Sequence, residues 1–283
     1  MRNGWAICRG LAAAVALLSA VNGLHAMPLA PVFRGQFAQG QGVDAQFIKV
    51  HDNWRGSGVR YDAATDQLGV GQPIGSFPGG TGIWGLIDWK TAHGSAPVGM
   101  IESQWSGRVA EIAFGDEEFD RLYRESWAAV ALAPLFGPDG SASSQDNWSS
   151  RFSGYIRISE AGAYNFSVLY DDGFFFNLVG DGGEMLSLSN DFLNPRNRMG
   201  FESSLLLDVG LYAFELGAYE HLEAGVVELS WMRDEGEWSR VPSSHLVATG
   251  EAAAVPEPGT WAMTLAGLLA LGSVMSKRRG ARP

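Results

Sequence analysis

Two adjacent carboxylates, those of Asp171 and Asp172, stand immediately before Gly173 in the second half of the chain. Calcium in proteins takes about six to eight hard oxygen ligands, and neighbouring carboxylates bring oxygen atoms and negative charge to one point. The pair therefore predicts a calcium site. Asp-Asp-Gly also suits a plain turn between two strands, in which the aspartate side chains accept hydrogen bonds from main-chain amides. The residue types leave both interpretations open.

Side chains suited to sugar recognition follow in the polar loop 189–198. Phe192 is expected to be exposed there, with a ring face that can stack on the apolar face of a sugar. Arg196 and Arg198 would donate hydrogen bonds to hydroxyls or acidic sugars, or they are simply solvated loop charges. The candidate ligand-binding residues are therefore Asp171, Asp172, Phe192 and Arg196.

Signals for catalysis are weak. Residues 80–85 spell the Gly-x-Gly-x-x-Gly dinucleotide fingerprint, but the sequence predicts neither a preceding strand nor a following helix. The chain has no His-Glu-x-x-His zinc motif and no Gly-x-Ser-x-Gly elbow. Glu220, Glu223 and Glu228 suggest either paired carboxylates for glycoside hydrolysis or a solvated turn before a strand. The sequence predicts a protein that is not an enzyme.

The elements that must position these residues are mostly β-strands. Apolar and polar residues alternate, with the period of a strand that buries one face, in 155–158, 164–170, 212–216 and 227–231. Their spacing of roughly ten residues predicts an antiparallel sandwich or barrel. One short helix is expected from Asp116 to Pro134, and the glycine-rich stretch 35–107 shows less regular signals.

From Gln145 to Leu246 the sequence resembles the protective-antigen-fourteen domain family. The segments that carry the resemblance are the opening strand 146–156, the Gly-x-Tyr-x-Phe strand at 162–166, the Asp-Asp-Gly corner at 171–173, the late strand 210–219, and the closing segments 227–231 and 241–242. The likeness covers about 100 of 283 residues. It implies a mainly β protein, an antiparallel β-sandwich, of a family in which many members bind carbohydrate.

The same resemblance implies a metal. In flocculin-type members the paired aspartates, often joined by a cis peptide bond, hold a calcium ion that contacts sugar hydroxyls. Carried over, Asp171 and Asp172 are the metal ligands. The family's further ligands come from a later loop, where Asn190, Asp191 and Asn194 match no motif.

The first 26 residues have the form of a secretory signal peptide. Arg2 and Arg9 precede or flank an apolar core at 11–18, and cleavage is expected after Ala26. The single cysteine, Cys8, lies in this segment, so the mature chain would contain no disulfide and no thiol chemistry.

The C-terminal end resembles the PEP-CTERM sorting signal. Pro256, Glu257 and Pro258 precede an uncharged apolar run, 259–276, which is long enough for a transmembrane helix, and a basic cluster follows it. In that family a membrane-embedded exosortase reads the Pro-Glu-Pro segment and cleaves nearby. The physical alternative is a permanent membrane anchor. The expected localisation is an inner-membrane intermediate and then the cell surface or the exterior.

Charge narrows the range of partners. Of 20 basic residues, six lie in segments 1–26 and 259–283, which would be removed if the second cut follows Pro258 and which contain none of the 31 acidic ones. The processed chain would carry a net charge of −17. Such a surface repels nucleic acid and anionic lipid, and suits divalent cations or neutral glycans. Simple solubility outside the cell explains it equally well.

These observations predict the organisation of the whole chain. It divides into a signal peptide (1–26), a Gly-rich β region that could share the sandwich (27–144), the sandwich core (145–248), a linker (249–258) and a membrane-spanning sorting tail (259–283). The predicted role is noncatalytic binding of extracellular or cell-surface glycans, with calcium as the candidate cofactor. The alternatives are a structural matrix protein without a specific sugar and, less favoured, a glycan-degrading enzyme.

Overall fold

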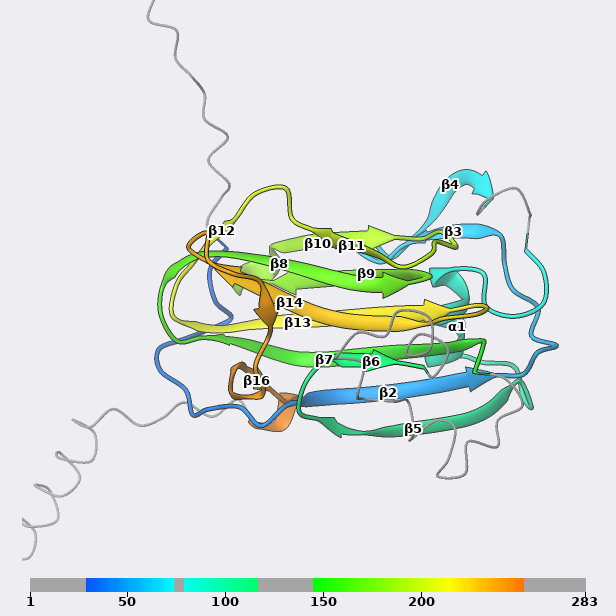
Figure 1. Cartoon of the computed structure of the whole chain (residues 1–283), viewed down its shortest axis with the longest axis horizontal. Helices are drawn as coiled ribbons and strands as arrows, with labels where there is room; N and C mark the ends of the chain where they lie inside the picture. The colour runs from blue at the N-terminus through cyan, green and yellow to red at the C-terminus, as the bar shows by residue number, and fades with distance from the viewer. Residues whose placement is uncertain (1–28, 74–78, 117–144, 252–283) are drawn as a thin grey trace, which may run out of the picture.

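The computed structural model describes residues 29–73, 79–116 and 145–251 (Figure 1). Both predicted terminal segments, 1–26 and 259–283, and nearly all of the expected helix after Asp116 lie outside this part of the chain. Within it, no helix is long and apolar enough to cross a bilayer.

Two antiparallel sheets pack face to face, which confirms the predicted β-sandwich. The larger sheet has the strand order β10-β9-β13-β7-β2-β5, with β1 and β16 added on β13 and β7. Its strands are β1 (Phe33–Arg34), β2 (Val43–Val50), β5 (Ile101–Val109), β7 (Trp148–Ile158), β9 (Gly173–Val179), β10 (Met185–Asn190), β13 (Gly210–Glu220) and β16 (Leu246–Val247).

The smaller sheet has the order β11-β8-β14-β15, with β12 on β8 and β6 on β14. Its strands are β6 (Ala113–Gly115), β8 (Gly162–Asp171), β11 (Asn197–Gly200), β12 (Leu205–Leu207), β14 (Val226–Arg233) and β15 (Ser239–Arg240). The alternation of apolar and polar residues in β8 buries one face of the strand, as the sequence predicted. The core between the sheets contains Tyr164, Phe166, Val168 and Tyr170. There they meet aromatic residues of the other sheet, among them Phe152, Phe174, Phe176 and Phe214.

Segments from the glycine-rich first half belong to the same sheet as the second half. β2 pairs with β7 on one side and with β5 on the other. Phe47 of β2 is fully buried in contact with Phe152 and Phe114. The core of the sandwich is therefore built from both halves of the sequence.

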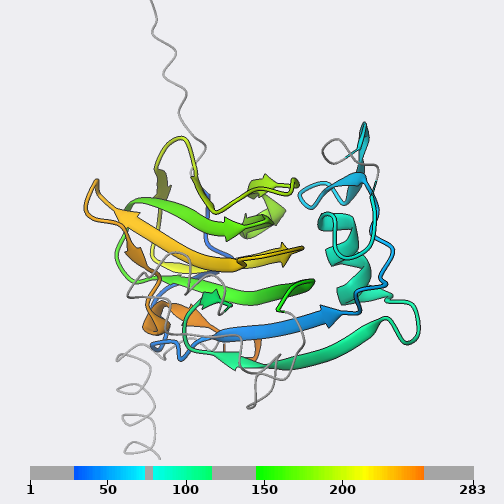
Figure 2. The ribbon, with the colours of Figure 1, turned by 45° about the vertical axis from the view of Figure 1, so that its right-hand side comes forward.

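A small cap covers one end of the sandwich and consists of the hairpin β3 (Val59–Asp62) and β4 (Gln67–Pro73) and the helix α1 (Leu86–Gly94) (Figure 2). The sequence did not predict α1, and the expectation that no helix follows residues 80–85 is wrong. The helix packs Leu86, Trp89 and Ala92 against Phe175 and Tyr219 of the larger sheet. This is no dinucleotide site, because β4 is antiparallel to β3 and the first helical N–H, that of Leu86, donates to the Asp191 carboxylate at 2.7 Å.

Candidate functional site

The Asp-Asp-Gly corner is the point where the chain crosses from one sheet to the other. Asp171 is the last residue of β8 in the smaller sheet, and Gly173 is the first residue of β9 in the larger one. The peptide bond between Asp171 and Asp172 is cis, as the resemblance implied. Gly173 has to be a glycine here, because a Cβ atom would lie 2.5 Å from the ring of Tyr219.

Main-chain amides from two distant segments bind the two aspartates. The N–H of His221, just after β13, donates to Asp172 Oδ2 at 2.9 Å. Main-chain amides of the loop after β10 also donate, that of Asn194 to the Asp172 carboxylate and that of Arg196 to Asp171. The aspartates therefore do accept amide hydrogen bonds, as the turn interpretation expects, but from other elements and not from their own turn.

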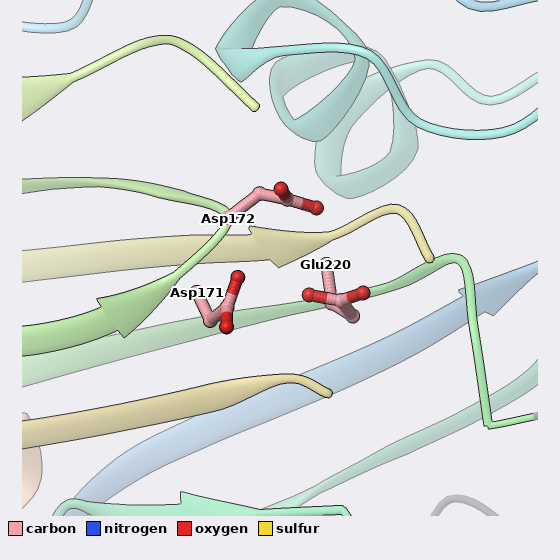
Figure 3. Close-up of side chains that lie close together, drawn as sticks. All are labelled: Asp171, Asp172 and Glu220. Atoms are coloured by element: carbon pink, nitrogen blue, oxygen red, sulfur yellow. The ribbon is translucent and has the colours of Figure 1, made fainter. Parts of the chain in front are cut away.

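A third carboxylate, that of Glu220, lies beside the pair (Figure 3). Glu220 is the last residue of β13, and oxygen atoms of the three side chains lie within 4.8 Å of one another. Its side chain is fully buried. Among the described residues, no amide, hydroxyl or basic group donates to its carboxylate oxygens, and its side chain interacts with that of Asp172.

The environment disfavours negative charge on all three groups. Burial, followed by the charge of Asp172, raises the pKa of Asp171 to about 8. Burial raises the pKa of Asp172 to about 7, and burial with the neighbouring aspartates raises that of Glu220 far above its usual range. Three carboxylates this close can all be ionised near neutral pH only if a cation lies between them.

Solvent reaches the site through a pocket of about 270 Å³. It is lined by Asp171, Asp172, Asn194, Pro195, Leu222, Glu223 and Ala224. Glu220 does not line it, so this carboxylate approaches the aspartates from the protein interior. Carboxylate and amide oxygens are the donors that calcium prefers, so the residues present fit that ion.

The loop after β10 completes one wall of the pocket. The side-chain NH₂ of Asn194 donates to three oxygens, those of Asn190 Oδ1, the Phe192 carbonyl and the Asp172 carbonyl. Its carbonyl oxygen is therefore the part of the amide suited to a cation. Asp191 anchors the loop to the cap, since its carboxylate accepts the main-chain N–H groups of Tyr61 at 2.8 Å and Leu86 at 2.7 Å.

The other two candidate ligand residues lie in this loop as well. Phe192 is half-buried, and the Arg60 guanidinium covers one face of its ring at 3.5 Å from the centroid. That face is not open to a sugar. Arg196 is also half-buried and contributes its main-chain amide to Asp171. Neither residue is among those that line the pocket.

The three glutamates near the end of β13 have separate roles. Glu223 is exposed at the pocket, as a solvated turn predicts, but Glu220 and Glu228 are buried and that interpretation is wrong for them. Glu228 forms ion pairs with Arg198 at 2.8 Å and Arg240 at 3.0 Å. Of the three, only Glu223 lines the pocket beside the aspartate pair. The sequence named Glu220 as a candidate carboxylate but did not predict its place beside the aspartate pair, for which its only signal is its position at the end of an alternating strand.

A second cavity of about 300 Å³ lies at the opposite end of β8 and β14. It is lined by Ser159, Glu160, Tyr164, Trp231, Arg233, Glu237, Ser239 and His245. Two of its charged groups, Arg233 and Glu160, form an ion pair.

Comparisons with known proteins identify the sorting signal. Residues 254–279 match the PEP-CTERM protein-sorting motif. The chain therefore carries the signal that the sequence predicted, and it is an exported protein sorted by exosortase through a membrane-anchored intermediate to the cell surface or exterior. No curated protein sequence matches the chain.

Solved structures similar to the chain include adhesin domains. A PA14 sugar-binding domain from an RTX adhesin is 16% identical over 74% of this chain and 99% of that one, with a TM-score of 0.42. The epithelial adhesin 6 A domain from Candida glabrata, in complex with Galβ1-3GlcNAc, is 12% identical over 79% and 93%, with a TM-score of 0.46. An anti-sigma factor domain-containing protein is 17% identical over 54% of this chain, with a TM-score of 0.38, and the chain spans only 44% of its length.

Proposed function

We propose that the sandwich binds carbohydrate through a calcium ion held by Asp171 and Asp172, without catalysis. The observation that carries the proposal is the position of these two carboxylates, which line a solvent-open pocket while a third carboxylate supports them from behind. A calcium ion there would be bound from the protein side and still have coordination positions facing solvent, where sugar hydroxyls can replace water.

The residues around the pocket suit a neutral sugar. Leu222 is 53% exposed and, with Pro195, offers an apolar wall for the C–H face of a sugar ring. Glu223, which also lines the pocket, would accept hydrogen bonds from sugar hydroxyl groups. The acidic surface of the processed chain disfavours strongly anionic glycans. Phe192 and Arg196 would act by shaping the loop and not by touching the sugar.

Export determines which glycans the protein would encounter. A protein sorted to the cell surface or exterior meets the polysaccharides of the extracellular matrix and of neighbouring cells. Adhesion within that matrix is the role that we assign to the sandwich.

The test is a glycan array probed with the full chain in calcium and in chelator. Wild-type protein is expected to bind a subset of neutral glycans only in calcium. Asp171→Asn is expected to lose this binding, because it removes a charge and an oxygen ligand. Asp181→Asn is the matched control, since Asp181 is an exposed aspartate just beyond the far end of β9.

Two results would contradict the proposal. Wild-type protein that binds no glycan in calcium would favour a structural matrix protein without a specific sugar. Binding that survives Asp171→Asn but is lost in Trp231→Ala would move the sugar site to the second cavity.

A further inference from the structure

We infer that Glu220 is a third carboxylate ligand of the cation, and that the ion thereby becomes a stabilising part of the fold that ties the two sheets together. The inference rests on the metal-binding half of the proposed function and not on the sugar. It assigns a role to a residue that does not line the pocket and that no sugar can reach.

Burial without a partner is the first reason. A buried carboxylate that makes no hydrogen bond loses its hydration without compensation, and such groups are rare in folded proteins. Glu220 is fully buried, and among the described residues no amide, hydroxyl or basic group donates to its oxygens, which face the acidic Asp172 side chain instead. The charged groups that act on it most strongly, Asp172, Asp171, Asp116 and Asp146, are all acidic. A cation is the partner that these surroundings lack.

Asp116 supplies an internal comparison. It is equally buried and lies close to Glu220, since a Cβ atom on Gly225 would touch the side chains of both. Its Oδ2, however, accepts hydrogen bonds from the Gly225 N–H at 2.6 Å and from Trp148 Nε1 at 3.4 Å. These hydrogen bonds from the protein therefore compensate the burial of the Asp116 side chain. Within the part of the chain that the structure describes, no such donor reaches Glu220, whose side chain interacts with the Asp172 carboxyl instead, and this distinguishes a structural carboxylate from one directed at an ion.

The three ligands come from both sheets. Asp171 ends β8 of the smaller sheet, Asp172 lies in the crossing between the sheets, and Glu220 ends β13 of the larger sheet. An ion held by all three joins the ends of these strands. Without the ion, ionising all three groups together destabilises this end of the sandwich, because the negative charges repel one another.

This geometry predicts effects of opposite sign for one substitution. Glu220→Gln removes a metal ligand, so calcium affinity is expected to fall at least tenfold. It also replaces a buried acidic group by a neutral group of the same shape, so the metal-free protein is expected to melt at an equal or higher temperature than metal-free wild type. A residue that only packs the core would lower the melting temperature of the metal-free form.

The experiment uses the full chain in detergent with calcium as the only ligand, so that the absence of sugar binding does not affect it. Titration calorimetry measures affinity, and thermal unfolding is followed in calcium and in chelator. The exposed Glu202→Gln is the matched control and is expected to behave as wild type. Calcium affinity of Glu220→Gln within twofold of wild type overturns the inference, and so does a lower melting temperature of its metal-free form.

A second measurement needs no substitution. Glutamate is labelled with ¹³C throughout the chain, and infrared difference spectra are recorded on addition of calcium. Because Asp171 and Asp172 remain unlabelled, a shifted ¹³C carboxylate band reports a glutamate ligand. The shift is expected in wild type and in Glu223→Gln, whose residue lines the pocket. Absence of a labelled shift in wild type, or its loss in Glu223→Gln, overturns the assignment to Glu220.

Discussion

Single residues at the corner combine chemical and steric roles. Main-chain amides from distant segments donate hydrogen bonds to the side chains of Asp171 and Asp172 and so orient them. Gly173 has no side chain, which lets Tyr219 approach the main chain. Tyr219 in turn donates from its hydroxyl to the Phe192 carbonyl at 3.1 Å. A change at the glycine is therefore transmitted to the loop that carries Asn194.

Gly173→Ala tests that steric argument. A Cβ atom 2.5 Å from three atoms of the fully buried Tyr219 ring forces the ring or the strand to move. Overpacking of this kind costs about 1–3 kcal/mol, so denaturant unfolding is expected to show a loss of that size, together with weaker calcium binding. Gly94→Ala is the control, because nothing lies within 4 Å of the Cβ position there. Equal stability of Gly173→Ala and wild type would contradict the steric reading.

At the scale of elements, alternation located the strands of the second half but could not locate the helix. The strands at 155–158, 164–170, 212–216 and 227–231 follow from local pattern alone and lie in β7, β8, β13 and β14. α1 has no local N-terminal capping signal, because Gly85 precedes it and its first N–H is bound by Asp191, 105 residues away in sequence. A cap supplied by tertiary structure leaves no pattern near the helix.

The residues of the candidate site likewise divide into those that local sequence reveals and those that only the fold brings together. The Asp-Asp-Gly corner could be found because its residues are consecutive. Glu220 and Asn194 join it only because β13 ends beside the corner and the loop after β10 folds over it. Sequence spacing cannot reveal that these distant residues lie close together. For the same reason Phe192 was predicted to be exposed, although Arg60 covers one face of its ring.

Asp191 links the cap to the loop after β10, and Asp191→Ala tests that link. The substitution leaves the main-chain N–H groups of Tyr61 and Leu86 without their acceptor. Buried hydrogen bonds to a charged group contribute about 1.5–3 kcal/mol each, so a stability loss of at least that size is expected. Calcium affinity is expected to fall as well, because Asn194 and Arg196 lose their support. Hydrogen exchange at β3 and α1 should accelerate selectively, and Asp208→Ala, at an exposed site, serves as control.

His93 at the end of α1 makes stability depend on pH. Its ring contacts Gln46 Oε1 at 3.0 Å and Ser149 Oγ at 3.1 Å, and burial, followed by the charge of Arg151, lowers its pKa to about 3. Since the unfolded histidine titrates near 6.5, the unfolded state binds more protons between these values. Stability is therefore lost as pH falls below 6.5.

His93→Gln should remove that part of the pH dependence. Between pH 7 and pH 5 the wild type is expected to lose about 1–2 kcal/mol more stability than the variant. Denaturant unfolding at the two pH values measures the difference. Parallel losses in the two proteins would show that the folded-state ring is not kept neutral.

At the scale of the whole molecule, the proposed site and the attachment point of the tail lie at opposite ends of the sandwich. Glu251, the last residue described, pairs with Arg108, and Thr249 bonds to Asp44 at the start of β2. β2 then runs to Lys49, which pairs with Trp148, the partner of Glu220. The sandwich thus presents the pocket away from the end that continues into the sorting tail, an arrangement suited to a protein held at a surface and binding outward.

The same topology determines whether residues 145–251 can fold without the first half of the chain. β2 lies between β5 and β7 in the larger sheet, and Phe47 packs on Phe114 and Phe152 in the core. A fragment that begins at residue 145 would expose this core face and leave one edge of β7 largely unpaired. Such a fragment is expected to remain unfolded or to aggregate, with no cooperative thermal transition. Residues 27–251 are expected to unfold in a single transition, because both halves share one core. Independent folding of residues 145–251, measured by circular dichroism and dispersed amide resonances, would show instead that the first half is a separate layer added to a complete domain.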